Sequence, residues 1–256
     1  MNTGSDKLSQ EVAERFSAAA AHYHSYDVLQ QQTASRLLAQ MTPGGRLLDI
    51  GAGPGTCFSH FERVNQVFCL DIADGMLKTL KGRFPHYTPI CGDAQNLPIA
   101  DGTIDSIYSN VALQWCQNLP KAVSEANRVL TEGGELNMSI VAKDSLMQLS
   151  ELGFKVNSFI DEQELVACFD DEDWQLESFE TKAVTVYFTD LRGLLQSIKG
   201  VGASIVKQQQ GVNQPQVTLR GRKDWQALQL KAELSRAPEG LPLTYNISFI
   251  KARKKR

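Results

Sequence analysis

The sequence lacks the features of secreted, membrane-spanning and metal-clustered proteins. Its 256 residues include five cysteines, an odd number, and none of them form a CxxC pair. We therefore expect neither a disulfide framework nor a metal site. No run approaches the roughly 18 consecutive apolar residues of a membrane-spanning helix, so we expect no association with a membrane. The first stretch, MNTGSDKLSQEVAERF, is polar and lacks the apolar core of a secretory signal. These absences predict a reduced, cytoplasmic protein, which we expect to be a monomer.

Charge is nearly balanced overall but unevenly distributed. The formal net charge is -3, yet residues 151–180 hold ten acids and one base, and residues 191–223 hold six bases and no acid. The tail KARKKR has five bases in six residues. A locally basic stretch can attract an acidic partner even in an acidic protein. Since aromatic residues do not interleave with these bases and the whole chain is acidic, we expect no nucleic-acid ligand.

The hydrophobic pattern predicts one domain in four parts. Residues 1–44 read as an N-terminal helical lid, 45–188 as a cofactor-binding core, 189–240 as a helical insertion, and 241–256 as a last strand with a basic tail. The sequence leaves open whether this tail is ordered. Strands are expected at 46–50, 66–71, 87–91, 103–109, 135–141, 179–188 and 243–250. Helices are expected at 8–23, 28–41, 56–63, 74–83, 119–130, 162–169, 191–199 and 223–235. This alternation is typical of an α/β, doubly wound, mostly parallel sheet covered by helices on both faces.

The stretch LLDIGAGPGT, residues 47–56, runs from a strand straight into three glycines. A phosphate-binding P-loop is excluded because no lysine follows Gly51, Gly53 and Gly55. The dinucleotide pattern GxGxxG fits only in part, because Thr56 stands where the third glycine belongs. The turn alone therefore leaves open a dinucleotide, another adenosine-bearing cofactor, or a simple tight turn.

Two acidic residues favour an adenosine-bearing ligand. Asp71 closes the second expected strand, 20 residues after Gly51, where a carboxylate can accept hydrogen bonds from ribose hydroxyls. Asp93 follows the third expected strand, where it can meet an adenine amino group. Both lie at the carboxyl edge of the predicted sheet, the side on which open α/β sheets bind their ligands.

The ordered segments LLDIGAGPG, LDIADGML, CGDAQNLPIADGTIDSIYSN and LTEGGEL resemble the class I S-adenosylmethionine-dependent methyltransferases over about residues 45–141. The resemblance implies a Rossmann-like, seven-stranded sheet with an antiparallel last strand; the strands counted above also number seven. It further implies S-adenosyl-L-methionine as the cofactor and leaves a nicotinamide dinucleotide as the minor alternative. It implies that the methionine part of the cofactor contacts Asp49, Gly51, Gly53, Gly55 and Asn110. It implies that the ribose contacts Asp71, that the adenine or ribose contacts Ile72 and Met76, and that the adenine contacts Asp93 and Ala94.

Segments 15–38, 109–119, 195–204 and 242–252 resemble one family, the malonyl-acyl-carrier-protein O-methyltransferases of biotin synthesis. The resemblance implies methyl transfer to the free carboxylate of malonyl-acyl-carrier protein, or of malonyl-coenzyme A. SNVALQWC is shared with other methyltransferases of small carboxylates, so a different small acceptor remains the alternative. A non-catalytic interaction module is a second alternative. The chain departs from the family at Ala18, where an arginine is common.

Methylation of a carboxylate needs no general base, because a carboxylate is already ionised at neutral pH. Tyr23, near the end of the first helical region, is a candidate hydrogen-bond donor to the cofactor or the substrate. Gln114 and Trp115 follow the fourth strand, on the expected acceptor side, and complete the predicted catalytic group. The acid-free stretch supplies the candidate contacts to the carrier protein and its phosphopantetheine arm, namely Lys199, Arg220, Arg222 and Lys223.

Overall fold

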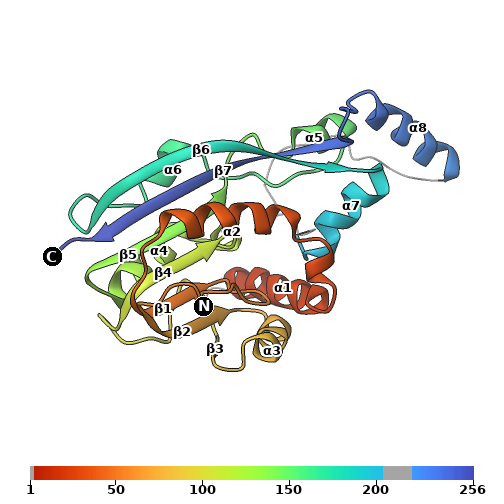
Figure 1. Ribbon diagram of the computed structural model, residues 1–256. Coiled ribbons are helices and arrows are strands. Elements are labelled where there is room, and N and C mark those ends of the chain that lie inside the picture. Colours follow the sequence, from red (N-terminus) through yellow and green to blue (C-terminus); the bar gives the residue numbers. More distant parts are fainter. Residues whose placement is uncertain (1–2, 204–220) are drawn as a thin grey trace.

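The computed structural model describes residues 3–203 and 221–256. Seven strands form one sheet in the order β3-β2-β1-β4-β5-β7-β6 (Figure 1). The strands are β1 Gly45–Ile50, β2 Val64–Asp71, β3 Thr88–Cys91, β4 Ile104–Asn110, β5 Leu130–Val141, β6 Trp174–Phe188 and β7 Leu241–Lys254. The pairs among β1 to β5 are parallel, whereas β7 runs antiparallel to both of its neighbours. This confirms the predicted α/β sheet with its antiparallel last strand.

The central strands are buried on both faces, which explains their continuous apolar sequences. Leu47 to Ile50 of β1 are all buried, and Leu136 to Val141 of β5 are buried without interruption. An antiparallel sheet with one wet face would instead alternate apolar and polar side chains. The sheet therefore needs helices on both sides.

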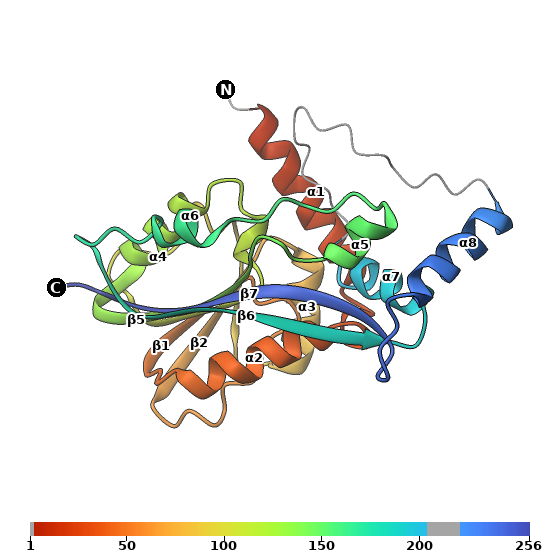
Figure 2. The same cartoon turned by 90° about the horizontal axis from the view of Figure 1, so that it is seen from above.

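Eight α-helices surround the sheet in the described part of the chain. They are α1 Thr3–Ala19, α2 Val28–Gln40, α3 Asp74–Arg83, α4 Leu119–Val129, α5 Met147–Leu152, α6 Glu162–Val166, α7 Leu191–Gly200 and α8 Arg222–Glu233. Figure 2 shows α2 on one face of the sheet and α4 and α6 on the other. The core is divided accordingly: Leu29 and Leu37 of α2 belong to one buried cluster, whereas Val123 and Val129 of α4 belong to another.

Helix α4 shows how local sequence sets these elements. Asn118 accepts a hydrogen bond from the Lys121 N–H at 3.0 Å and caps the first turn, and Pro120 occupies a position where it costs no helical hydrogen bond. Val123, Ala126 and Val129 recur at helical spacing and are buried against the sheet. The predicted helix and the observed one differ by a single residue at the end.

The helix expected at residues 56–63 is wrong. The segment TCFSHFER forms turns, in which Phe61 and Val64 donate backbone hydrogen bonds to carbonyls three residues earlier. Its residues are mostly weak helix formers. The aromatic ring of Phe58 is also buried, and the Phe58 N–H donates to the Tyr87 hydroxyl at 3.0 Å. Tertiary packing of Phe58 fixes the chain in a shape that a helix could not give.

The basic tail, whose order the sequence leaves open, belongs to β7 as far as Lys254. Arg253 Nε donates to Glu177 Oε1 at 2.6 Å, and Lys254 Nζ donates to the Asn127 carbonyl at 2.8 Å. Glu135, which is only 3% exposed, lies 3.7 Å from an Arg253 nitrogen and 3.8 Å from Lys251 Nζ. The tail is held because its bases neutralise acids on β5 and β6.

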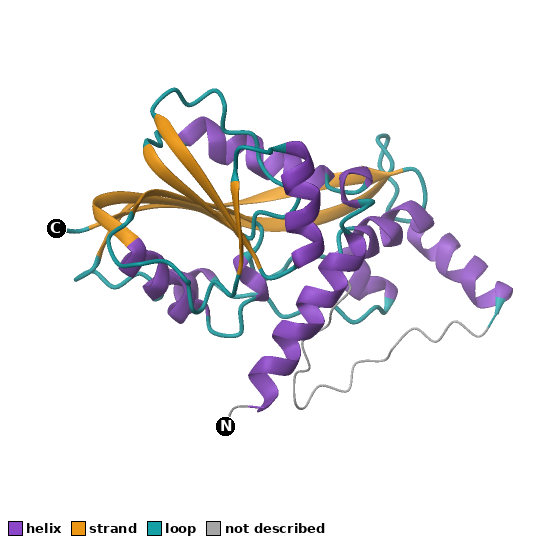
Figure 3. Ribbon diagram, turned by 90° about the horizontal axis from the view of Figure 1, so that it is seen from below, coloured by secondary structure: helices purple, strands orange, loops and turns teal. Residues whose placement is uncertain are grey.

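Helices α7 and α8 lie between β6 and β7 in the chain, as predicted for the insertion. Figure 3 shows them with α1 at one end of the sheet. Helix α5, which the sequence pattern did not indicate, packs against α8 and β7. No helix in the described ranges is long and apolar enough to cross a membrane.

Candidate functional site

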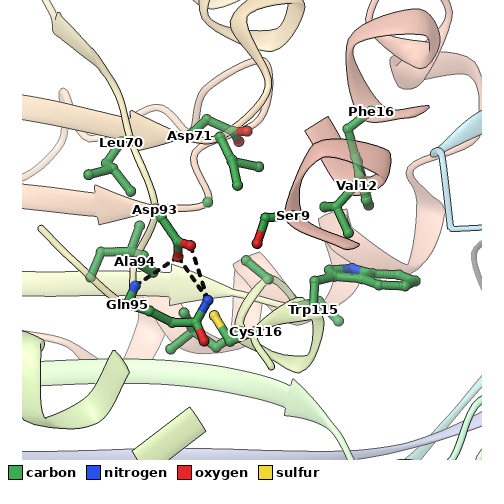
Figure 4. Close-up of a pocket in the computed structure, with 17 residues that line it drawn as sticks. Ser9, Val12, Phe16, Leu70, Asp71, Asp93, Ala94, Gln95, Trp115 and Cys116 are labelled. Carbon is green, nitrogen blue, oxygen red and sulfur yellow. Dashed lines mark hydrogen bonds between the residues drawn. The ribbon is translucent and has the colours of Figure 1, made fainter. Parts of the chain in front are cut away.

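A pocket opens at the carboxyl ends of β1, β2 and β4, and we call it the strand-end pocket (Figure 4). It brings together five of the residues predicted to bind the cofactor, namely Gly51, Asp71, Ile72, Asp93 and Ala94. Ser9, Val12 and Phe16 of α1 face Asp71 and Asp93 across the pocket. The N-terminal helix therefore covers the pocket.

The glycine turn after β1 brings bare backbone to the edge of this pocket. Gly51, Gly53 and Gly55 all have positive φ angles, of 71°, 53° and 92°. A Cβ on Gly51 would lie 2.2 Å from the Ala112 Cβ, so this position needs glycine for packing. A Cβ on Gly53 would meet nothing within 4 Å. Gly53 therefore borders open space, and its backbone is free to approach a ligand closely.

Asp71 ties this turn to the end of β2. Its Oδ2 accepts from the Gly53 N–H at 2.8 Å, and its Oδ1 accepts from the Ala73 N–H at 2.8 Å. Each carboxylate oxygen keeps a further lone pair, so Asp71 can still accept hydrogen bonds from ligand hydroxyls. Burial raises the pKa of the Asp71 carboxyl, and the N–H groups of Ala73 and Gly53 oppose that shift.

Asp49, two residues before the turn, is a second buried carboxylate. It is 1% exposed, and its Oδ2 has no hydrogen-bond partner within the described chain. Burial raises the pKa of Asp49 well above its usual value, the neighbouring Asp71 raises it further, and the Thr56 N–H opposes both effects. Such a group is costly unless a ligand supplies a donor or a positive charge.

A second cleft lies against the glycine turn, and we call it the turn cleft. Gly53, Gly55, Asn110, Tyr23 and Gln30 are among the residues that line it. The Asn110 amide donates to the Gln30 carbonyl at 2.9 Å and accepts from Ser139 Oγ at 2.8 Å, so Asn110 holds α2 against β4 and β5. The side-chain Oε1 of Gln30 is buried with no partner among the described residues.

Asp93 is held by Gln95, which the sequence analysis missed. The Gln95 backbone N–H donates to Asp93 Oδ1 at 2.9 Å, and its side-chain Nε2 lies 3.1 Å from both carboxylate oxygens (Figure 4). Gln95 Oε1 in turn accepts from the Asn118 N–H at 2.8 Å. The acid and the amide are only two residues apart, but no local pattern marks the amide as the partner of the acid.

Met76 does not border the strand-end pocket. It is 1% exposed and packs in a small buried cluster with Ala20 and Ala73, against which Phe16 and Tyr23 also lie. The Met76 side chain therefore packs against the end of α1 and the segment that follows it.

A third hollow, the inner cavity, meets both of the others. Tyr23, Gln114 and Trp115, the three predicted catalytic residues, all line it. Trp115, Phe16 and Val111 border the strand-end pocket as well, and the Trp115 and Phe16 rings pack edge to face with centroids 5.5 Å apart. Tyr23 borders the inner cavity and the turn cleft. The predicted catalytic residues therefore stand where the hollows join.

The main chain is strained at this junction. Val111 follows β4 directly and has a φ of 49°, a value that is rare for a β-branched residue. Its N–H donates to the Ser139 carbonyl at 3.0 Å, which holds the unusual conformation. Strain of this kind costs on the order of 1–3 kcal/mol and is found preferentially at functional sites. The turn at Val111 directs residues 112–115 across the mouth of the inner cavity.

The buried Tyr23 hydroxyl has an unusual environment. Burial raises its pKa above the usual range, and the negative charges of Asp27 and Asp71 raise it further. The hydroxyl therefore stays protonated at neutral pH and remains a hydrogen-bond donor.

Gln114, the second predicted catalytic residue, is tied to the strained turn: its Nε2 donates to the Val111 carbonyl at 2.7 Å.

The four residues predicted to contact a carrier protein do not form one patch. Lys199, which is exposed on the last turn of α7, borders a groove between α1 and α7 that we call the α1–α7 groove. Arg222 and Lys223 are exposed at the start of α8, and Figures 1 and 2 show that end of α8 far from the end of α7. Arg220 lies outside the described residues.

The close approach of α7 to the segment after α1 depends on glycine. A Cβ on Gly200 would come within 2.2 Å of the Tyr26 ring, and Gly202, with a φ of 80°, packs against the Phe16 backbone. Tyr26 borders both the α1–α7 groove and the inner cavity. The glycines of KGVGAS therefore let α7 end against the wall of the cavity.

Comparisons with known proteins agree with this architecture. Residues 48–138 match a family model described as a methyltransferase domain. The solved structure of a putative methyltransferase from Bacillus halodurans aligns with a TM-score of 0.59 at 16% identity, covering 88% of this chain and all of that one. The sheet order, the glycine turn and the acids at the strand ends define a class I methyltransferase fold.

Sequence relatives identify the methyltransferase family to which the chain belongs. A malonyl-[acyl-carrier protein] O-methyltransferase from Herminiimonas arsenicoxydans is 34% identical over 94% of this chain and 94% of its own length. The biotin biosynthesis bifunctional protein BioHC from Cellvibrio japonicus is also 34% identical over 94% of this chain, which spans 49% of that longer protein. The chain belongs to the malonyl-[acyl-carrier protein] O-methyltransferase family.

The buried charge of Asp49 predicts a conflict between stability and binding. Because the pKa of Asp49 is raised, the native state holds more protons than the unfolded state above the usual carboxyl pKa, and stability falls as pH rises through that window. Asp49→Asn should therefore raise the free energy of unfolding at neutral pH by about 1–3 kcal/mol and flatten its dependence on pH. The same change should weaken binding of S-adenosylhomocysteine about tenfold or more. Urea unfolding at several pH values and calorimetry test this.

The control is Asp74→Asn, an exposed acid that pairs with Lys78 at 2.5 Å. It should leave both stability and binding nearly unchanged. If Asp49→Asn destabilises the free protein at neutral pH, the account of an uncompensated carboxylate is wrong.

The open space beside Gly53 predicts a steric effect on binding. Gly53→Ala puts a methyl group at a positive φ, which costs about 1–2 kcal/mol, and fills the space that borders the turn. We expect a folded protein that binds S-adenosylhomocysteine at least about tenfold more weakly. Gly82→Ala is the matched control, because Gly82 lies in α3 with open space around it and no unusual φ. It should leave binding unchanged and stabilise the protein by about 0.4–1 kcal/mol.

Proposed function

We propose that this chain transfers a methyl group from S-adenosylmethionine to the free carboxylate of a malonyl thioester carried on acyl-carrier protein, as an early step of biotin synthesis. One observation carries the proposal: the strand-end pocket, lined by the buried Asp71, the half-buried Asp93 and Gly51 of the glycine turn, meets a separate inner cavity at Val111 and Trp115. A cofactor and an acceptor need such adjoining sites. The names of the relatives support the choice of acceptor.

The residues of the strand-end pocket and the turn cleft fit the proposed cofactor, together with the buried Asp49, which directly precedes the pocket-lining Ile50. Asp71 would receive the ribose hydroxyls, and Asp93 with Ala94 and Ile72 would meet the adenine. Asp49 Oδ2 and Gln30 Oε1, both buried and without partners in the described chain, suit the amino group of the methionine part, which is a cation with three donors. The bare backbone at Gly53 leaves room for that part.

When bound, S-adenosylmethionine supplies a methyl group on a cationic sulfur, which passes to a carboxylate oxygen while the electron pair of the broken bond stays on sulfur and no proton moves. The protein therefore needs no general base. Its work is to hold the carboxylate in line and to exclude water, and good positioning contributes roughly 7–11 kcal/mol in such reactions. Trp115 and Phe16 would wall the reacting groups, and Tyr23 would donate a hydrogen bond beside them.

Helix α1 is the closing element of this site. It covers the strand-end pocket, and it packs so closely on α3 that a Cβ on Gly75 would lie 2.8 Å from the Ser17 carbonyl. The Gly75 N–H also donates to Ser17 Oγ at 3.2 Å. This contact fixes the lid over the pocket at one end and keeps the reacting centre dry.

The carrier protein is an acidic partner, and Lys199 is the best placed of its four proposed contacts. Lys199 borders the α1–α7 groove, which reaches the inner cavity at Tyr26. The phosphopantetheine arm would enter along this groove, with Lys199 near its phosphate. Arg222 and Lys223, at the start of α8, would act farther out on the carrier.

Methyl transfer from labelled S-adenosylmethionine to malonyl-acyl-carrier protein, malonyl-coenzyme A and free malonate tests the proposal. We expect base-labile label on the malonyl-carrier, and less of it at high salt, because exposed ion pairs weaken with ionic strength. Lys199→Glu should raise the KM for the carrier substrate about two- to fivefold at low salt. Lys78→Glu, on the exposed side of α3, should not.

No label on any malonyl species, with S-adenosylhomocysteine still bound, would overturn the choice of acceptor and leave a class I methyltransferase with a different small substrate. Equal transfer to free malonate and to the carrier would overturn the docking role of Lys199.

A further inference from the structure

The inner cavity holds no charged side chain among the described residues that line it. Its polar lining consists of three tyrosines, three carboxamides and Ser197, and the rest is apolar or aromatic. This is unexpected in a site for an anionic acceptor, because carboxylates are usually bound by arginine or lysine. The cavity must therefore hold its ligand in another way.

Most of the polar groups in the cavity are already used within the protein. Ser197 Oγ donates to the Leu194 carbonyl at 2.7 Å, and Gln114 Nε2 donates to the Val111 carbonyl at 2.7 Å. The hydroxyls of Tyr23, Tyr26 and Tyr245 make no hydrogen bond within the described chain. These three hydroxyls are donors left for a ligand, beside the side-chain N–H groups of Gln30 and Trp115, for which no hydrogen bond is found among the described residues.

The three tyrosines stand at different places around the cavity. Tyr23 also borders the turn cleft, and Tyr26 also borders the α1–α7 groove. Tyr245 borders the inner cavity alone. It lies on β7 opposite Val184 of β6, and its neighbour Thr244 is fixed by hydrogen bonds to Gln148. A rigid strand therefore presents a free hydroxyl to the cavity.

We propose that the inner cavity is a charge-neutral carboxylate site, in which the Tyr245 hydroxyl donates to the substrate carboxylate and the bound cofactor, rather than any described residue of the lining, supplies the positive charge that this carboxylate meets. The inference rests on the proposed function and names how that site recognises its substrate. Burial also raises the pKa of Tyr245 above the usual range, so its hydroxyl stays a donor at neutral pH.

The chemistry of the transfer explains why a neutral cavity is suitable. A carboxylate and a sulfonium lose their opposite charges together as the new ester forms. A protein cation would stabilise the ionised carboxylate more than the transition state, in which part of that charge is already gone, and so would slow the reaction. After transfer, the same cation would stay buried beside a neutral ester, which is a costly arrangement. A hydroxyl can donate a hydrogen bond to the ionised carboxylate before the transfer and to the neutral ester after it.

The test is a binding measurement on the full-length protein saturated with either of two cofactor analogues. Sinefungin carries an ammonium group where the cofactor carries its methylated sulfur, whereas S-adenosylhomocysteine has a neutral sulfur. Malonyl-acyl-carrier protein should bind at least about tenfold more tightly to the sinefungin complex. Acyl-carrier protein with a bare phosphopantetheine arm should bind both complexes equally, which controls for docking. Equal affinity of the malonyl-carrier for the two complexes would overturn the neutral site.

Tyr245 is tested in the sinefungin complex. Tyr245→Phe should weaken binding of the malonyl-carrier about tenfold or more, as expected for loss of a hydrogen bond to a charged group, without changing the affinity for sinefungin itself. Tyr187→Phe is the matched control, because Tyr187 is 43% exposed on β6, away from the cavity. Wild-type affinity of Tyr245→Phe would overturn the role of this hydroxyl. If the malonyl group adds no affinity in either complex while both analogues bind, the proposed function fails, and this inference fails with it.

Discussion

The ligand-binding edge of the sheet depends on the hydrogen bonds of one buried carboxylate. Asp71 takes the Gly53 N–H on one oxygen and the Ala73 N–H on the other, so the turn after β1 and the turn after β2 are held together. The Leu70 carbonyl adds to this link by accepting from the N–H groups of Gly51 and Ala52. The open backbone at Gly53 and the free lone pairs of Asp71 are therefore placed by the same interaction.

That arrangement has an electrostatic cost. Asp49 is buried near Asp71, and the negative charge of Asp71 makes the ionised form of Asp49 less favourable. Under the proposed function, a cationic, hydroxyl-bearing ligand bound near the two acids would offset this cost. Stability of the free chain and affinity for the ligand are in this way opposed at the same residues.

The sequence alone predicted the parts of this site that follow from position along parallel strands. Gly51, Asp71 and Asp93 each lie just after a strand, and the carboxyl ends of parallel strands converge on one edge, so their meeting is a matter of topology. Gln30, Val111 and Tyr245 could not be found this way. Gln30 reaches the site from a helix more than fifteen residues before the glycine turn, and Tyr245 from a strand at the far end of the chain. The left-handed conformation of Val111 has no sequence signature, because nothing in its type favours it.

The wrongly predicted helix at residues 56–63 and the ordered basic tail have the same physical origin. The turns at residues 56–63 are decided by the burial of Phe58 under Tyr87, and the basic tail is decided by acids on β5 and β6. In both places, contacts distant in sequence outweigh the local preference.

The division of the site into an acidic cofactor side and a neutral acceptor side also has a counterpart in the chain. The strand-end pocket is built mainly from residues 50–116, within or near the segment that matches the general methyltransferase family. The inner cavity takes most of its walls from α2, from β6 and β7 and from α7, which lie outside that segment, whereas Val111, Gln114 and Trp115 of its lining lie within it. The relatives of the malonyl family, in contrast, match more than nine-tenths of the chain. The proposed acceptor cavity is therefore enclosed largely by segments outside the general methyltransferase match, as expected if those segments determine which carboxylate is methylated.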